Sequence, residues 1–334
     1  MKKILLVALA AAAMVGCSQN EEIENAAQKV EINFGTVVKT GTKALITTTS
    51  SLTEFTVNAY KTQAAMDENT QLSADNALTT PAAFLVSKGK GDDDSWSAAS
   101  LIYWPLTDKV QFFATSPAQS LTLPSKGYPT FSYTVGEIGQ QKDFIAANVI
   151  NKAKSDADRT VTFAFQHLLT QVNFSVKGDL VGCVYNVTKL ELVGIKDQAT
   201  FTFKGDATVG DWSNIQATTG KYEWTGELNF TPAQLTDTLA IGKAGEALFM
   251  LMPQALSDAS LKITYSAKPA GASDFTFNAS KTIALTQTWS KSQNIRYTLI
   301  LTNDNAPVTF GTPSVGGWVD DKPSQPEVTP TTQP

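Results

Sequence analysis

Apolar and polar residues alternate with a period of two through most of this chain. In an extended strand this spacing sends one set of side chains to the interior and the other set to water. Threonine is common between the apolar positions, which is typical of strands. The alternating apolar sets are Val30/Ile32/Phe34, Phe55/Val57/Ala59, Phe131/Tyr133/Val135, Val161/Phe163/Phe165, Val172/Phe174/Val176, Leu190/Leu192, Phe201/Phe203, Leu261/Ile263/Tyr265, Phe275/Phe277 and Ile295/Tyr297/Leu299/Leu301.

Short turns separate these alternating segments. The tripeptide KGD at residues 177–179 and again at 204–206 is a clear turn signal. No long amphipathic helix pattern is present, and we predict a loop with a short helix for residues 62–90, which are rich in Ala, Asn and Ser. Many short strands joined by regular turns favour an all-β protein built from β-sandwiches.

One polar stretch divides the pattern into two halves. Residues 148–159 mix lysine, arginine and aspartate closely enough to resist burial. We therefore place the domain boundary there, between an N-terminal sandwich at residues 30–150 and a C-terminal sandwich at residues 159–321. The final residues, 322–334, are rich in Pro and Thr and are predicted to be extended or disordered.

The chain begins with the features of an export signal. Lys2 and Lys3 precede twelve uninterrupted apolar residues at 4–15. Twelve residues make a helix of about 18 Å, which is too short for a hydrocarbon core of about 30 Å. We therefore interpret residues 1–16 as a signal peptide and not as a membrane span, and no later apolar run predicts a transmembrane helix.

Residues 14–17, MVGC, resemble the lipobox of bacterial lipoproteins, in which Cys17 is acylated and becomes the mature N-terminus. Residues 17–29 are polar with clustered glutamates, so we predict a solvated tether. Acyl chains contribute about 0.8 kcal/mol per buried CH₂, enough for several of them to hold a protein on the outer membrane. The alternative is an ordinary secreted protein in which Cys17 is incidental.

The charged, cysteine and histidine residues restrict the chemistry. A net charge of −5 offers no basic footprint for nucleic acid. The chain has two cysteines, and if Cys17 carries lipid then Cys183 has no intramolecular disulfide partner. His167 is the single histidine, which leaves no set of His and Cys ligands for zinc. We interpret Cys183 and His167 as buried strand residues.

No catalytic motif is recognisable. The sequence has no glycine-rich phosphate loop and no nucleophile elbow. No pair of carboxylates stands out as the acid and base of a glycosidase, and the aspartates at 92–94 are interpreted as a solvated loop rather than a calcium site. We therefore expect no enzymatic activity, no metal site and no cofactor.

Six motifs in a fixed order carry a family resemblance, and each is individually weak. Alone, they are compatible with core aromatics and buried strands. In this order along the chain they resemble the fimbrillin family, the pilus subunits of Bacteroidetes. The motifs are IYWP with VQFFA (102–105, 110–114), QKDFIAA (141–147), FQHLL with VNF (165–169, 172–174), FMLMPQ (249–254), Trp289 with IRY (295–297), and VGGW (315–318).

The resemblance implies a fold and a maturation pathway. It implies two tandem transthyretin-like Greek-key β-sandwiches, exported as a surface-exposed outer membrane lipoprotein. A trypsin-like maturation protease would then remove the first strand, which contains Val30, Ile32 and Phe34. Residues 40–44 resemble the family's cleavage segment, with Lys43 in place of arginine before Ala44.

The same resemblance implies that a neighbouring pilus subunit supplies the replacement strand by β-strand addition. From position and alternation we expect the donor strand at the C-terminal end of the chain, and the pilus would support adhesion to a surface glycan or protein. Lys39 is a second candidate for the cleavage site. The proposed donor side chains are Val308, Phe310, Val315 and Trp318.

An alternative function is also compatible with the sequence. The chain could be a glycan-binding surface lipoprotein of a polysaccharide-uptake system. Such a protein needs an exposed aromatic platform, and Trp96 and Trp212 are the candidates because they lie near polar turns.

Overall fold

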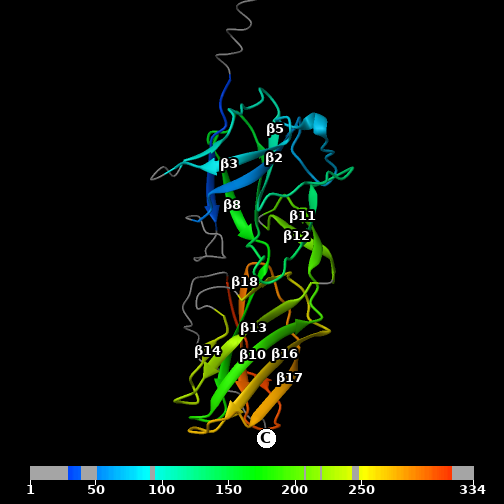
Figure 1. Ribbon diagram of the computed structural model, residues 1–334. Helices are drawn as coiled ribbons and strands as arrows, with labels where there is room; N and C mark the ends of the chain where they lie inside the picture. Colours follow the sequence, from blue (N-terminus) through cyan, green and yellow to red (C-terminus); the bar gives the residue numbers. More distant parts are fainter. Residues whose placement is uncertain are drawn as a thin grey trace, which may run out of the picture.

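The structure is a computed structural model, and it shows an elongated, nearly all-β molecule built from two stacked units (Figure 1). The all-β sandwich-type fold predicted from the alternation is confirmed. No helix in the part that the structure describes is long and apolar enough to cross a membrane. The described residues are 29–38, 51–90, 95–206, 208–218, 220–242 and 248–317.

Several predicted functional positions lie outside the described residues. They are the lipidation residue Cys17, the cleavage residues Lys43 and Ala44, and the last donor residue, Trp318. The remaining strand residues of both predicted segments are described.

The first unit is a closed barrel of seven strands in the order β1-β4-β3-β2-β5-β7-β8. Its interior is filled by the alternate, apolar side chains of these strands, as the period-two pattern requires. We expected two separate sheets here. Instead, β1 pairs with both β4 and β8 and so closes the sheet into a barrel. The barrel strands are β1 (Phe34–Val38), β2 (Glu54–Thr62), β3 (Ala83–Lys88), β4 (Trp96–Ala98), β5 (Lys109–Ser116), β7 (Ile145–Lys152) and β8 (Val161–His167).

The first unit ends with strand β8. It pairs with β1 in parallel and with β7 in antiparallel orientation, so it lies within the barrel. The division expected within residues 148–159 therefore runs through β7 and the loop between two barrel strands. The chain leaves the barrel after His167, and the next strand begins at Thr170. The polar loop before β8 is a surface turn, which explains why its composition resembled a linker.

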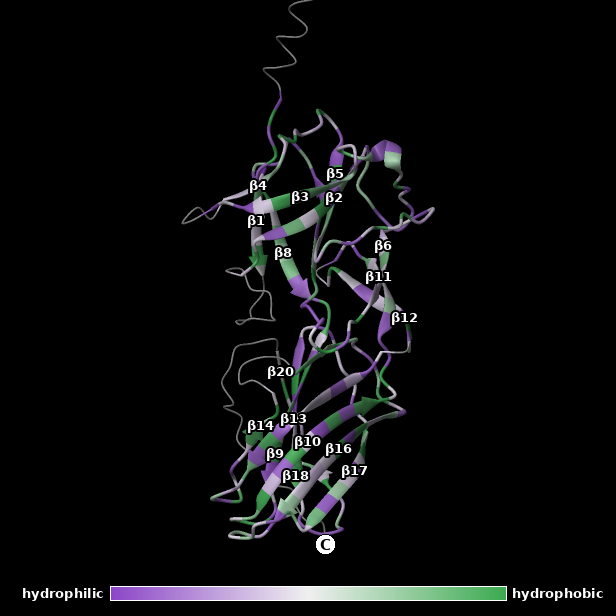
Figure 2. Cartoon of the chain, viewed as in Figure 1, coloured by the Kyte–Doolittle hydropathy of each residue, from purple (hydrophilic) through white to green (hydrophobic). Residues whose placement is uncertain are grey.

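The second unit is a sandwich of two sheets. A four-stranded sheet has the order β13-β10-β16-β17, and the other sheet is built on the parallel pair β9 and β18, with β14 and β15 beside β9 and β19 and β20 beside β18. Burial alternates along β16 and β18, and hydrophobic and hydrophilic bands alternate along β10 (Figure 2). The strands are β9 (Thr170–Gly178), β10 (Val184–Val193), β13 (Tyr222–Phe230), β14 (Leu239–Ala240), β15 (Phe249–Leu251), β16 (Ala259–Lys268), β17 (Phe277–Leu285), β18 (Gln293–Leu301), β19 (Thr309–Phe310) and β20 (Ser314–Gly317).

A small third sheet joins the two units. Its order is β12-β11-β6, and it combines one strand from the first half of the chain with a hairpin from the second half. The rings of Phe131 and Phe201 stack across it with centroids 5.1 Å apart, and Trp212 packs edge-on at 5.1 Å from Phe201. The strands are β6 (Thr130–Thr134), β11 (Gln198–Phe203) and β12 (Gly210–Gln216).

Residues 62–90 contain more structure than the sequence predicted. The expected short helix is a 3-10 turn, η1 (Ala74–Asn76), and the strand β3 follows it. Only Val86 of β3 is fully buried, while its other side chains are exposed or intermediate. A strand with one buried side chain has no visible alternation, and for that reason the pattern did not predict it.

Candidate functional site

The first described strand fills a slot in the barrel with large apolar side chains. Ile32 is 3% exposed and Phe34 is 7% exposed, and Val30 packs against the same core. The Phe34 ring stacks on Phe163 of β8 at 6.5 Å between centroids and contacts Phe84 of β3 at 5.9 Å. The predicted first strand is therefore an integral part of the barrel core.

Backbone hydrogen bonds hold this segment from both sides. The Ile32 N–H donates to the Ile102 carbonyl at 2.8 Å, and the Val30 carbonyl accepts from the Trp104 N–H at 2.9 Å. On the other side, the Asn33 carbonyl accepts from the Val161 N–H at 2.8 Å, where the five-residue parallel ladder with β8 begins. The barrel has no exposed edge at this position while the strand is present.

Gly35 lets the strand approach β8 closely. A Cβ atom added at Gly35 would lie 3.3 Å from Thr162 Oγ1 and 3.9 Å from Thr162 Cβ. Few real Cβ contacts are as short as the first distance, so a larger residue would press on β8. The glycine therefore belongs to the fit of the strand in its slot.

The burial of this strand is large compared with the stability of a domain. Ile32 and Phe34 each contribute about 1.5–3 kcal/mol by leaving water, and a domain is stable by about 5–15 kcal/mol. Val37, by contrast, is half exposed and adds little. Loss of the strand would open an apolar slot and leave β8 unpaired on the side away from β7, which is the kind of edge that pairs with another chain.

The predicted donor residues lie on a sheet of their own chain. β19 and β20 pair with β18 in antiparallel orientation at the edge of the second unit. Val308 is buried, whereas Phe310 is only partly buried against Tyr297, with ring centroids 5.2 Å apart. Val315 is 51% exposed. The C-terminal segment is therefore seated, but less completely than β1.

The turn that precedes β19 is held by side chains. Lys281 Nζ on β17 donates to the carbonyls of Asn305 and Ala306 at 3.0 and 2.9 Å. The Thr302 hydroxyl donates to the same Ala306 carbonyl at 3.2 Å. These bonds fix the point at which the C-terminal segment leaves the end of the sandwich.

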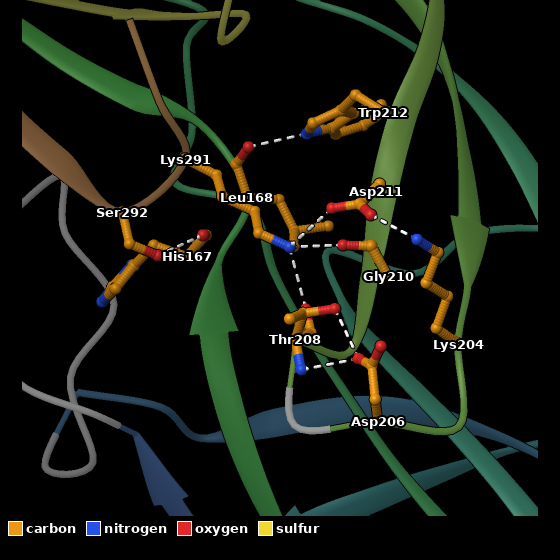
Figure 3. A network of polar contacts seen from close by, with 10 residues as sticks. All are labelled: His167, Leu168, Lys204, Asp206, Thr208, Gly210, Asp211, Trp212, Lys291 and Ser292. Carbon is orange, nitrogen blue, oxygen red and sulfur yellow. Dashed lines mark hydrogen bonds and ion pairs between the residues drawn. The ribbon is translucent and has the colours of Figure 1, made fainter.

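A polar network locks the third sheet onto the second unit (Figure 3). Lys291 Nζ, from the loop before β18, donates to the Thr208 carbonyl at 2.9 Å and to the Gly210 carbonyl, and it pairs with Asp211 Oδ1 at 3.3 Å. Asp211 Oδ2 also pairs with Lys204 Nζ at 2.6 Å. The hydrogen bond from Lys204 lowers the pKa of the Asp211 carboxyl below its ordinary value.

Further contacts in this region tie the connection between β8 and β9. Trp212 Nε1 donates to the Leu168 carbonyl at 2.7 Å, and the Ser292 hydroxyl donates to the His167 carbonyl at 2.6 Å. The Met250 N–H donates to Gln141 Oε1 at 2.8 Å, which links the first unit to β15. We refer to these contacts, the Lys291 network and the third sheet as the junction.

The candidate residues for other activities have structural roles. Trp96 is 9% exposed and contacts Phe55, and Trp212 is packed in the junction, so the two supply no exposed aromatic platform. The glycan-binding alternative loses the observation on which it depended. His167 is buried, with Nδ1 2.9 Å from Asp143 Oδ2.

The remaining polar chemistry is also structural. Cys183 is buried and its thiol donates to the Lys268 carbonyl at 3.3 Å, and burial raises its pKa, which disfavours the reactive thiolate. Within the described residues, no group of three or more His, Cys, Asp and Glu side chains could hold a metal ion. The strongest candidate for function is therefore the β1 slot together with the C-terminal strands.

Comparison with known proteins points in the same direction. The sequence model of a fimbrillin-like family matches residues 42–318. Fimbrium subunit Fim1C of Phocaeicola vulgatus is 31% identical over 218 residues, which cover 58% of this chain and 56% of that protein. The match thus spans about half the length of that curated relative.

The fold also has a solved counterpart. A crystal structure of a fimbrial protein from Bacteroides vulgatus superposes with a TM-score of 0.62 at 21% sequence identity. The superposition covers 86% of this chain and 99% of that one. It shows that the two proteins share the two-unit fold over most of the length of this chain.

Proposed function

Because the chain belongs to the fimbrillin-like family, we propose that it is a structural subunit of a cell-surface pilus that supports adhesion. The subunit assembles when a protease cuts after Lys43, β1 leaves its slot, and the C-terminal strand of a neighbouring subunit takes its place. The observation that carries this proposal is that β1, the first described strand of the chain, closes a barrel that is otherwise open between β4 and β8.

The physical reason for assembly is the unfilled slot. Without β1, the pockets of Ile32 and Phe34 are exposed and β8 has an unpaired backbone edge. A strand from another subunit restores both the apolar contacts and the main-chain hydrogen bonds. Removal of β1 therefore makes association with a neighbour favourable. An uncut subunit keeps β1 in its slot and so stays apart from its neighbours.

We further propose that export proceeds through acylation of Cys17 and that the lipid places the uncut subunit on the outer membrane surface. Cleavage after Lys43 would separate the lipid and β1 from the rest of the chain in one step. The motif at residues 14–17 supports the anchor, and the match of residues 40–44 to the family's cleavage segment supports the cut.

The decisive experiment is N-terminal sequencing of the protein recovered from the cell surface. The proposal expects a start at Ala44, and a start at Thr40 would place the cut at Lys39 instead. A Lys43→Ala variant should keep the lipidated Cys17 and remain outside polymers. If the wild-type protein in assembled pili still begins at Cys17, the exchange proposal is wrong.

A further inference from the structure

The strand that fills the slot has a near copy at the other end of the chain. Residues 32–36 read INFGT and residues 308–312 read VTFGT. The tripeptide Phe-Gly-Thr occurs at these two places and nowhere else in the sequence. The other two positions keep their character, since Ile and Val are both β-branched, and Asn and Thr are both polar.

Four of the five repeated positions have a defined environment in the segment formed by Ile32, Asn33 and β1. Ile32 and Phe34 supply the buried side chains, Gly35 allows close contact with Thr162, and the Thr36 hydroxyl lies buried. Residues 308–312 offer a branched aliphatic side chain, a phenyl ring, a glycine and a threonine at the same spacing. The repeat therefore reproduces the features that fit the slot, in the same chain direction.

The prolines that flank the second copy agree with this register. Pro307 would stand at the place of Glu31, where the hydrogen bonds to the 102–104 segment use the Ile32 N–H and the Val30 carbonyl. A missing N–H costs no ladder bond at that position.

Pro313 marks the other limit. The Asn33 carbonyl points to β8, so the backbone groups of alternate residues, including those of Val37, also face β8. Pro313 would stand at Val37 and has no N–H to donate to this ladder. The matching segment therefore ends at Thr312, which is also the last residue of the repeat.

The ends of the molecule place donor and slot in suitable positions. β9 and β18 run in parallel from the junction to the far end of the second unit, so the turn at residues 302–306 lies at that end. β8 runs toward the junction and β1 is parallel to it, so β1 enters the barrel at the opposite end of the molecule (Figure 1). Copies stacked end to end would bring residue 306 of one copy to the entrance of the next slot.

We propose that residues 308–312 of one copy take the place of residues 32–36 in the next copy, with Phe310 in the Phe34 pocket and Gly311 against Thr162. The partner is a second copy of this chain, because the chain carries both the slot and a near copy of the strand that fills it. This inference rests on the proposed function and adds the register and the identity of the partner.

A disulfide trap tests the register. The Gly35 and Thr162 Cβ positions are 3.9 Å apart, close to the mean of about 3.8 Å for a disulfide. The protein is the full chain with Cys17→Ser and a site-specific protease sequence inserted after Lys43. In this background, Gly311→Cys with Thr162→Cys should give a covalent ladder after cutting, which disappears on reduction. The uncut protein should remain monomeric.

The matched control moves the second cysteine along β8. Ala164 has the same outward-facing orientation two residues further on, and Gly311→Cys with Ala164→Cys should give at least tenfold less ladder. A ladder that favours Ala164 contradicts the register. If electron microscopy shows polymers but neither cysteine pair crosslinks, the proposed register is wrong while the proposed function stands. If the purified parent protein forms no polymers after cutting, self-assembly from copies of this chain is wrong. If pili recovered from cells also contain no donor strand in the slot, the proposed function is wrong as well.

A competition experiment gives an independent readout. A peptide of residues 30–38 and a peptide of residues 306–317 should both slow polymer growth of the cut protein, because both fill the same slot. The 306–317 peptide with Phe310→Asp should lose this effect by at least tenfold. If only the 30–38 peptide inhibits, the C-terminal segment does not bind the slot and the inference is wrong.

Discussion

β1 and the C-terminal pair β19 and β20 are formed by the two ends of the described chain, yet the molecule covers them differently. β1 lies between two neighbouring strands, and Phe34 in it and Ile32 just before it are almost completely buried. β19 and β20 pair with β18 alone, leave Phe310 partly exposed and present Val315 to solvent. The deeply buried strand lies upstream of the proposed cut and would be removed. The less buried C-terminal strands lie downstream of the cut and would stay with the subunit.

This asymmetry gives the proposed exchange a direction. A C-terminal segment that leaves its own sheet loses one pairing partner and a half-buried ring. The same segment in an empty β1 slot would gain two pairing partners and a closed pocket. Variants that alter each strand separately test this difference.

The largest effect is expected on assembly. Deletion of residues 306–334 removes the donor and should abolish polymers completely while leaving a folded monomer, because the other six barrel strands and most of the sandwich remain. Size-exclusion chromatography and circular dichroism of the cut protein measure both outcomes. Unchanged polymers would show that the donor lies elsewhere in the chain.

The next largest effect is expected on stability in the β1 slot. Phe34→Ala removes a buried ring and should lower the free energy of unfolding of the uncut protein by about 3–5 kcal/mol. The matched variant Val37→Ala, at a half-exposed position of the same strand, should change it by less than about 0.5 kcal/mol. Urea denaturation measures both, and equal losses would contradict the burial that distinguishes these positions.

A smaller loss is expected for the corresponding ring at the C-terminal strands. Phe310→Ala should lower the stability of the uncut protein by about 1–2 kcal/mol, because its side chain is only partly buried. The same variant should nevertheless abolish polymer growth after cutting, as its ring is needed in the neighbour's slot. If Phe310→Ala costs as much stability as Phe34→Ala, the two strands are equally held and the comparison fails.

A modest effect is expected at the turn before β19. Lys281→Met removes two hydrogen bonds to the 305–306 carbonyls and should weaken the seating of the C-terminal strands by about 0.5–1 kcal/mol. Amide exchange in β19 should become faster, and polymers should form sooner after cutting. Lys262→Met on β16 is the control and should change neither rate. Slower polymer growth with Lys281→Met would contradict a holding role.

The smallest effect is expected at the junction and depends on pH. The pKa of Asp211 is lowered in the folded protein by Lys204, so its carboxylate stabilises the fold above the ordinary pKa of an aspartate. That contribution is lost as the pH falls through the lowered pKa. Asp211→Asn should therefore reduce stability slightly at pH 7 and flatten the acid limb of the stability profile. An identical acid limb in wild type and variant would show that this pair is screened by solvent.

Much of the fold was accessible from the sequence because side chains alternate wherever a strand has one face in a core. β1, β16 and β18 were predicted in this way, and the position of the first strand followed from Val30, Ile32 and Phe34. β3 was missed because a single residue, Val86, is buried. The extent of the barrel was missed because a polar loop before β8 has the composition of a linker.

The junction could not be predicted for a different reason. Its third sheet pairs β6 with β11, strands more than sixty residues apart in sequence, and either strand alone would fit many partners. The seating of β19 and β20 on β18 was likewise invisible, because alternation shows which face of a strand is apolar but not which neighbour it meets. The INFGT and VTFGT repeat was readable in the sequence, but its meaning depends on knowing that Gly35 contacts Thr162.

The junction has a mechanical consequence for a filament made of such subunits. Aromatic stacking and the Lys291 contacts fasten the barrel and the sandwich to each other, so the distance from the slot to the outgoing C-terminal segment does not vary freely. The subunit then behaves as a stiff rod whose own length sets the axial spacing of the fibre. Bending must be concentrated where one rod meets the next, and traction along the fibre would load the inserted strand lengthwise.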